Sequence, residues 1–218
     1  MSFLKKLING GEVLETFNSP FNGKMDVFKD FSGRVSLKCD GVVQSGGLAE
    51  KLWQKGVKEI SKFRGKREIR ECLILGLGAG TLVKLLLKEF KDCKITAVEI
   101  DPLVIKAGEK YFNLKKGKAL KIINSNAFEV LEKVKGKFDL IVVDLYKGQE
   151  FPAKAEGEAF FKTLLGLLDN KGIVVFNRLN YSPIHKAKTQ VFRQKAERSF
   201  KRLKTISAVT NLLLLASN

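Results

Sequence analysis

The stretch that decides the fold is Leu73-Ile74-Leu75-Gly76-Leu77-Gly78-Ala79-Gly80-Thr81. Its apolar first part predicts a buried β-strand, and a helical pattern begins at Thr81. Glycines between a strand and a helix let the backbone turn sharply and approach a bound molecule, while the helix N-terminus offers free N–H groups. A tight turn without a ligand is the alternative interpretation. Three glycines in five positions favour a site with a close neighbour.

Strand-like and helical patterns alternate on both sides of this stretch. We expect strands at 72–75, 95–98, 120–123, 140–143, 173–176, 203–209 and 212–216. We expect helices at 81–90, 103–111, 127–134, 156–168 and 184–200. This alternation predicts an α/β fold with a doubly wound, mostly parallel sheet. Only Thr210 and Asn211 separate the last two strands, which must therefore form an antiparallel hairpin. The layout is that of a Rossmann-like class I methyltransferase fold.

The first part of the chain has a different character. Turn dipeptides such as Asn22-Gly23 and Asp40-Gly41 separate short alternating runs, which predicts a small antiparallel β-unit over residues 1–47. From Leu48 the apolar residues follow helical spacing. We therefore predict an N-terminal β-unit at 1–47 and a Rossmann-like domain at 48–218.

Composition excludes several classes of protein. The 218 residues include one His and three Cys, and hydrophobic residues make up 44% of the chain, which excludes a disordered protein. The cysteines form no CxxC pair, so we expect no metal and a cytoplasmic setting. No apolar run is long enough for a membrane span, and the N-terminus has no leader pattern. We expect no membrane association.

The formal net charge of +17 is concentrated in two segments. Residues 51–70 carry eight basic and two acidic residues, and residues 178–204 carry nine and one. In the second segment we expect the apolar residues Ile184, Ala187, Val191, Phe192 and Phe200 to pack on the sheet. We interpret both segments first as solvated basic surface, and second as a docking site for an acidic partner or nucleic acid.

Polar residues follow the predicted strands at the edge where the glycine loop lies. Glu99 ends the second strand, and a carboxylate there can accept hydrogen bonds from both hydroxyls of a ribose. Asp101 precedes Pro102 at a helix start and is expected to be a structural N-cap. Asn126 can contact an adenine edge, although it also fits an N-cap with Glu129 at capping-box spacing.

Asp144 follows the fourth strand beside the expected crevice. We predict that it acts as a base or orients a substrate, while a loop-capping Asp is the alternative. Tyr146 is predicted to shape the same pocket. A glycine loop, a ribose carboxylate and an adenine-edge residue, in this order, suit S-adenosylmethionine.

In combination these motifs resemble the spermidine synthase (polyamine aminopropyltransferase) family of the class I methyltransferase superfamily. The resemblance runs from about residue 22 to the end of the chain. It rests on the segments 39–44, 76–81, 98–101, 126–128, 138–144 and 211–216.

The resemblance implies binding of S-adenosylmethionine or its decarboxylated form, a small-molecule acceptor and a homodimer. The implied cofactor residues are Gly76, Gly78, Ala79, Gly80, Glu99, Ile100, Asn126, Ala127 and Asp144. The expected catalytic residues are Asp144 and Tyr146, and the expected substrate residues are Gln44, Tyr146, Lys147 and Glu150.

Two departures from the family pattern bear on the reaction. Family synthases carry an acid in the glycine loop where Ala79 stands, and a second acid three residues after the catalytic Asp, where this chain has Lys147. A lysine facing inward repels a polyamine. Glu150, on the same loop, offers a partial substitute.

We therefore expect a methyltransferase with an unidentified acceptor. The first alternative is an aminopropyltransferase that makes spermidine or a related polyamine. The second is a nucleic-acid-binding or RNA-modifying protein that uses the basic segments.

Overall fold

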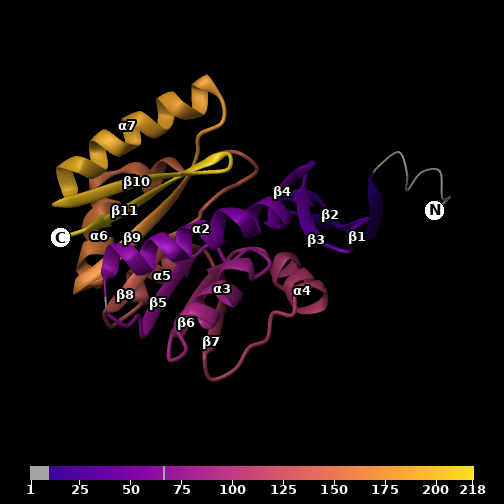
Figure 1. The fold of residues 1–218 in the computed structure, drawn as a ribbon, viewed down its shortest axis with the longest axis horizontal. Helices are drawn as coiled ribbons and strands as arrows, with labels where there is room; N and C mark the ends of the chain where they lie inside the picture. The colour runs from indigo at the N-terminus through magenta and orange to yellow at the C-terminus, as the bar shows by residue number, and fades with distance from the viewer. Residues whose placement is uncertain (1–9, 66) are drawn as a thin grey trace.

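The computed structural model describes residues 10–65 and 67–218. A seven-stranded sheet has the order β10-β11-β9-β8-β5-β6-β7 (Figure 1). The bounds of its strands, in chain order, are β5 Glu71–Leu75, β6 Lys94–Glu99, β7 Leu120–Asn124, β8 Phe138–Val143, β9 Leu168–Leu179, β10 Arg202–Ala208 and β11 Asn211–Ser217. Strands β5 to β9 are parallel, and β11 runs antiparallel to both β9 and β10. The predicted fold class, with its C-terminal hairpin, is confirmed.

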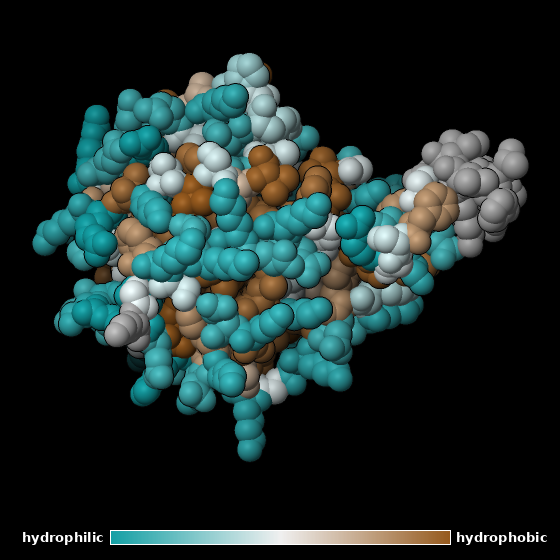
Figure 2. Space-filling model, in the orientation of Figure 1, coloured by the Kyte–Doolittle hydropathy of each residue, from teal (hydrophilic) through white to brown (hydrophobic). Residues whose placement is uncertain are grey.

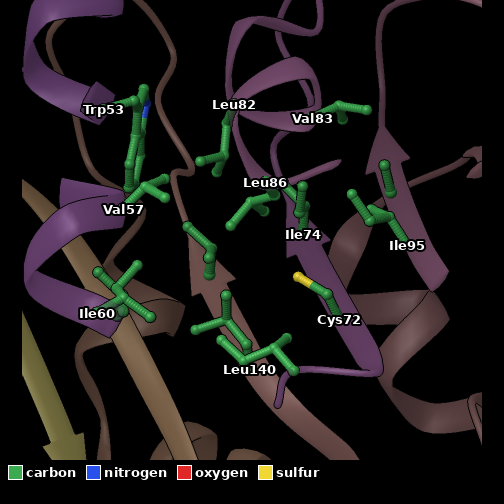
Figure 3. Close-up of a cluster of buried hydrophobic side chains, with 14 of the residues drawn as sticks. Trp53, Val57, Ile60, Cys72, Ile74, Leu82, Val83, Leu86, Ile95 and Leu140 are labelled. Atoms are coloured by element: carbon green, nitrogen blue, oxygen red, sulfur yellow. The ribbon is translucent and has the colours of Figure 1, made fainter. Parts of the chain in front are cut away.

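Helices cover both faces of this sheet. Their bounds are α2 Gly47–Arg64, α3 Thr81–Glu89, α4 Pro102–Tyr111, α5 Ala127–Lys133, the 3-10 turn η1 Ala153–Glu156, α6 Glu158–Leu167 and α7 Pro183–Ser199. Successive residues of a strand face opposite sides, so Cys72 and Ile74 pack with α2 and α3, while Leu73 and Leu75 pack with α5, α6 and α7. Figure 3 shows the first of these clusters, in which Trp53 and Leu86 lie above the sheet.

A second, four-stranded sheet precedes α2. It is an antiparallel meander of β1 Gly11–Ser19, β2 Gly23–Asp30, β3 Val35–Cys39 and β4 Val42–Gly46. Its buried residues Met25 and Leu37 form one cluster with Val104 and Ala107 of α4. The division of the chain at residue 47 stays a prediction.

One packing expectation is wrong. In α7 the side chains of Ile184 and Val191 are 67% and 51% exposed, and Ala187 is exposed as well. Phe192 and Phe200 are buried as expected. The helix turns Thr189, Phe192 and Ala196 toward the sheet, and a helix of 3.6 residues per turn then leaves residues 184, 187 and 191 outside.

Hydrophilic side chains are spread over the face of the molecule that Figure 2 shows, with hydrophobic side chains visible between them. Among the residues that the structure describes, no helix combines the length and the apolar character that crossing a membrane requires.

Candidate functional site

The strand order reverses between β5 and β8, and α/β folds bind ligands at the carboxyl ends of strands at such a point. A cavity of about 760 Å³ lies there. The predicted cofactor residues on its wall are Gly76, Gly78, Glu99, Ile100, Asn126, Ala127 and Asp144. The predicted substrate residues Gln44, Tyr146, Lys147 and Glu150 are on the wall too. The structure thus brings together residues from the N-terminal sheet and from the ends of four parallel strands, β5, β6, β7 and β8.

Ala79 and Gly80 lie behind the wall. The methyl group of Ala79 is fully buried in the cluster that joins α4 to the N-terminal sheet. Its backbone N–H donates a 2.8 Å hydrogen bond to Ser45 Oγ. The glycine loop is therefore held from behind by strand β4, a contact that the sequence did not indicate.

The glycines of the loop have close neighbours within the protein itself. Gly76 has a φ of +92°, and a Cβ there would lie 2.2 Å from the carbonyl oxygen of Asp144. A Cβ on Gly78, at a φ of +56°, would lie 2.8 Å from Ser45 Oγ. Contact with a ligand is therefore not the only reason for these glycines, because the loop also packs closely against the chain.

Glu99 lies at the end of β6 with 8% of its surface exposed. Its Oε2 accepts a hydrogen bond from Gly78 N at 3.0 Å, and its Oε1 accepts one from Asp101 N at 3.1 Å. Burial raises the pKa of this carboxyl to about 7, and the backbone hydrogen bonds oppose the rise. Glu99 is thus fixed in orientation at the edge of the glycine loop, where we expect a carboxylate that binds the ribose hydroxyls.

Asp101 has the structural role that we predicted. Its Oδ1 accepts a hydrogen bond from Leu103 N at 2.9 Å and caps α4. Its Oδ2 accepts hydrogen bonds from Ser19 Oγ and from Asn22 Nδ2, the latter at 2.6 Å. Asp101 therefore joins the N-terminal sheet to the Rossmann-like part of the chain.

Asn126 caps α5 by accepting a 2.9 Å hydrogen bond from Phe128 N on its Oδ1. No hydrogen bond to the Nδ2 amino group is found among the residues that the structure describes, which leaves this group for a ligand in the cavity. Ile100 lies on the same cavity wall and is 40% exposed. An exposed aliphatic side chain offers a suitable surface for a flat base.

Asp144 lies at the end of β8. Its Oδ1 accepts a 2.7 Å hydrogen bond from Asn177 Nδ2, and Asn177 Oδ1 accepts one from Asn211 Nδ2 at 2.8 Å. Desolvation raises the pKa of Asp144 to about 6, while hydrogen bonds from Asn177 and Trp53 lower it. The result is a carboxyl that is largely ionised at neutral pH and retains some basicity.

Tyr146 has its hydroxyl engaged with the backbone of β9. The hydroxyl donates to Asn177 O at 3.1 Å and accepts from Leu179 N at 2.8 Å. Burial raises the pKa of this phenol above its ordinary value. The ring lines the cavity, whereas the hydroxyl holds the wall in place.

The loop after β8 closes the cavity toward the N-terminal sheet. Lys147 and Glu150 form a turn through two backbone hydrogen bonds of 3.0 Å, and both side chains are exposed. Gln44 Nε2 donates a long, 3.5 Å hydrogen bond to Gly148 O. This contact links the loop after β8 to β4.

Three residues of the site escaped the sequence analysis. Asn177 follows the apolar run of β9, in the same position as Asp144 after β8, so a search of every strand end would have found it. Arg178 lies on the cavity wall next to Asn177. Trp53 belongs to a helix whose spacing indicated only a buried face.

Part of the basic charge has a structural role. Lys62 and Lys204 both pair with Glu59, at 2.7 and 2.9 Å. Arg64 pairs with Asp139 at 2.7 Å and is largely buried. An acidic partner or nucleic acid at segments 51–70 and 178–204, like homodimerisation, stays a prediction.

Comparison with known proteins matches residues 52–213 to the family of the spermine/spermidine synthase domain. The polyamine aminopropyltransferase of Vibrio vulnificus is 27% identical over 124 residues, which are 56% of this chain and 42% of that protein. The eEF1A lysine and N-terminal methyltransferase homolog of Drosophila pseudoobscura pseudoobscura is 32% identical over 139 residues, 51% of this chain and 21% of that protein.

The fold has a clear counterpart among solved structures. The spermidine synthase of Thermotoga maritima aligns with a TM-score of 0.77 at 19% identity, covering 94% of this chain and 72% of that one. The chain spans about half or less of the length of the curated relatives it matches. These relatives are transferases of two kinds, for aminopropyl and for methyl groups.

Proposed function

Since the chain belongs to the spermine/spermidine synthase domain family, we propose that it is an S-adenosylmethionine-dependent methyltransferase that acts on a small-molecule acceptor. The observation that carries the choice of a methyl group is Lys147. This cation is on the cavity wall three residues after Asp144. The resemblance to the family's synthases implies an acid at this position. At an effective dielectric of ~20, two unit charges ~4 Å apart interact by about 4 kcal/mol, so the sign of this charge matters to a polyamine.

The residues present fit an adenosyl group. The fixed carboxylate of Glu99 suits two ribose hydroxyls, and the free amino group of Asn126 with exposed Ile100 suits an adenine. The glycine loop exposes backbone rather than side chains where Gly76 and Gly78 reach the wall.

When bound, S-adenosylmethionine supplies an electrophilic methyl group on a sulfonium. Asp144 orients the acceptor and takes its proton on the carboxylate, which the amide of Asn177 holds in place through Oδ1. Its pKa of about 6 keeps it ionised at neutral pH. Tyr146 and Gln44 line the same cavity as Asp144.

Calorimetric titration of the purified protein tests this proposal. S-Adenosylmethionine, its decarboxylated form and methylthioadenosine are compared side by side. We expect S-adenosylmethionine to bind most tightly, and Glu99→Gln to weaken it by about 10- to 100-fold. Glu132→Gln, an exposed carboxyl on α5, is the matched control. Tighter binding of the decarboxylated form would contradict the methyl assignment.

Aminopropyl transfer is the second candidate, and it is favoured by Gln44 and Asp144, which the resemblance assigns to the acceptor. Both are on the cavity wall. The test is formation of spermidine from putrescine and decarboxylated S-adenosylmethionine. Robust turnover would establish this reaction and show that Lys147 does not face the bound amine.

A further inference from the structure

We propose that the acceptor carries a carboxylate, which binds at the end of the cavity formed by Arg178 and Lys188. This inference rests on the proposed function, because it names the substrate class of the same site. Arg178 is at the end of β9, and β8 and β5 separate that strand from β6, which carries Glu99. The anion site and the expected ribose site thus occupy opposite ends of one cavity.

The side chain of Arg178 is only 4% exposed and has unmade hydrogen bonds. Its Nη2 donates to Glu156 Oε1 at 2.7 Å. Its Nε and Nη1 have no hydrogen-bond partner among the described residues. A guanidinium has five N–H donors, and buried donors are nearly always paired. A wall residue of the cavity with two such atoms points to a ligand that completes its hydrogen bonds.

The surroundings of the guanidinium select the kind of ligand. The ring centres of Phe151 and Phe192 lie 4.1 and 4.5 Å from its central carbon. The two ring centres are 5.8 Å apart, so the rings pack on neighbouring sides of the guanidinium and do not sandwich it. A planar carboxylate matches the remaining N–H donors of such a group. Because Nε and Nη1 are closed to solvent, the ligand must displace part of this packing, and Phe151, in the loop after β8, is half-buried.

The charged residues nearest this end are Arg178, Glu156 and Lys188. Over the whole wall the cations are Lys147, Arg178 and Lys188, and the anions are Glu99, Asp144, Glu150 and Glu156. Glu156 already pairs with Arg178, whereas Lys188 makes no ion pair among the residues that the structure describes. Lys188 is therefore the charge that a carboxylate would meet beside Arg178.

Matched pairs of small probes test the proposal by calorimetry. The pairs are 4-aminobutyrate with putrescine, 5-aminovalerate with cadaverine, and benzoate with benzylamine. We expect at least one carboxylate to bind at least tenfold more tightly than its amine partner. Lys188→Glu should abolish that preference. Lys186 is two residues before Lys188 on α7 and is not among the residues that line the cavity. Lys186→Glu should therefore retain the preference for the carboxylate.

Arg178→Lys is the second variant, and it keeps the charge but loses the planar fork. It should weaken carboxylate binding at least fivefold while the circular dichroism spectrum is unchanged. Equal or tighter binding of the amine in all three pairs would overturn the carboxylate site, and so would the absence of binding by any probe. Equal effects of Lys188→Glu and Lys186→Glu on the preference would overturn it as well. Each probe is titrated with and without S-adenosylmethionine. The proposed function is tested by the binding of S-adenosylmethionine alone, so its failure is distinguished from failure of the carboxylate site.

Discussion

Asn177 Nδ2 donates a 2.7 Å hydrogen bond to Asp144 Oδ1, and so joins the ends of two adjacent parallel strands, β9 and β8. The same amide accepts a hydrogen bond from Asn211 on β11. Three strands therefore determine the position of the carboxyl that we assign as the base. The amide also favours the ionised form of Asp144, against the desolvation that raises its pKa.

Replacing Asn177 should move the pKa of Asp144 upward from its value of about 6. Asn177→Ala removes a hydrogen bond to the carboxylate, and we expect a rise of about one unit. Because the base is then protonated over a wider range, the acid limb of any methyl-transfer profile moves to higher pH. Carbon-13 NMR titration of the Asp144 carboxyl measures the shift without an acceptor.

Asn170→Ala is the control for this substitution, since Asn170 is an exposed residue at the other end of β9. It should leave the pKa of Asp144 unchanged. An unchanged pKa in Asn177→Ala would mean that the amide only holds the strands together.

Tyr146→Phe should affect stability more than proton transfer. The hydroxyl bridges Asn177 O and Leu179 N, so its loss leaves a backbone N–H of β9 unpaired. We expect the free energy of unfolding to fall by about 1–2 kcal/mol. The pH profile of the reaction should keep its shape. A change in that profile would instead support the catalytic role that we predicted from the sequence.

Much of the fold was accessible from the sequence because period and glycine spacing are local signals. The apolar run at 72–75, one of a series of strands alternating with helices, helped to predict the parallel sheet. The two-residue connection Thr210-Asn211 predicted the antiparallel pair at its edge. In the N-terminal part the turn dipeptides predicted an antiparallel β-unit, but not the bounds of its strands β1 to β4. In α7 the exposed Ile184 and Val191 show that apolar character alone does not identify the packed face.

The site was accessible only in part, for a physical reason. Glu99, Asn126 and Asp144 end strands, and strand ends of a parallel sheet meet at one edge. The contact between Ser45 and Ala79 N joins positions 34 apart, and no sequence period encodes it. The orphaned edge of Arg178 depends on the side chains around it, which only the assembled fold reveals.

Stability should fall as the pH rises through the titration of Glu99. Its folded pKa, about 7, is above its ordinary value of 4.5, so the folded state binds this proton more tightly. The resulting stabilisation is complete below pH 4.5 and is lost as the pH rises through 7. Glu99→Gln removes the titration. Between pH 5 and pH 8 the free energy of unfolding of the wild type should fall by about 2–3 kcal/mol more than that of Glu99→Gln.

Urea unfolding at the two pH values measures this difference. Glu132→Gln, with an exposed carboxyl, should keep the pH dependence of the wild type. Equal slopes in Glu99→Gln and the wild type would show that the Glu99 carboxyl titrates normally in the folded protein.

Gly76 and Gly148 form a matched pair that separates backbone strain from close packing. Both have positive φ angles, +92° and +59°. A Cβ at Gly76 would meet the backbone of Asp144 at 2.2 Å, whereas no atom of the described residues lies within 4 Å of a Cβ at Gly148. Gly148→Ala should lower the free energy of unfolding by about 1 kcal/mol, the cost of a left-handed residue with a side chain. Gly76→Ala must also push β5 and β8 apart, so it should cost about 3 kcal/mol or more and weaken S-adenosylmethionine binding. Chemical denaturation and calorimetry of both variants measure the two effects, and equal losses would mean that the glycine loop can yield without disturbing Asp144.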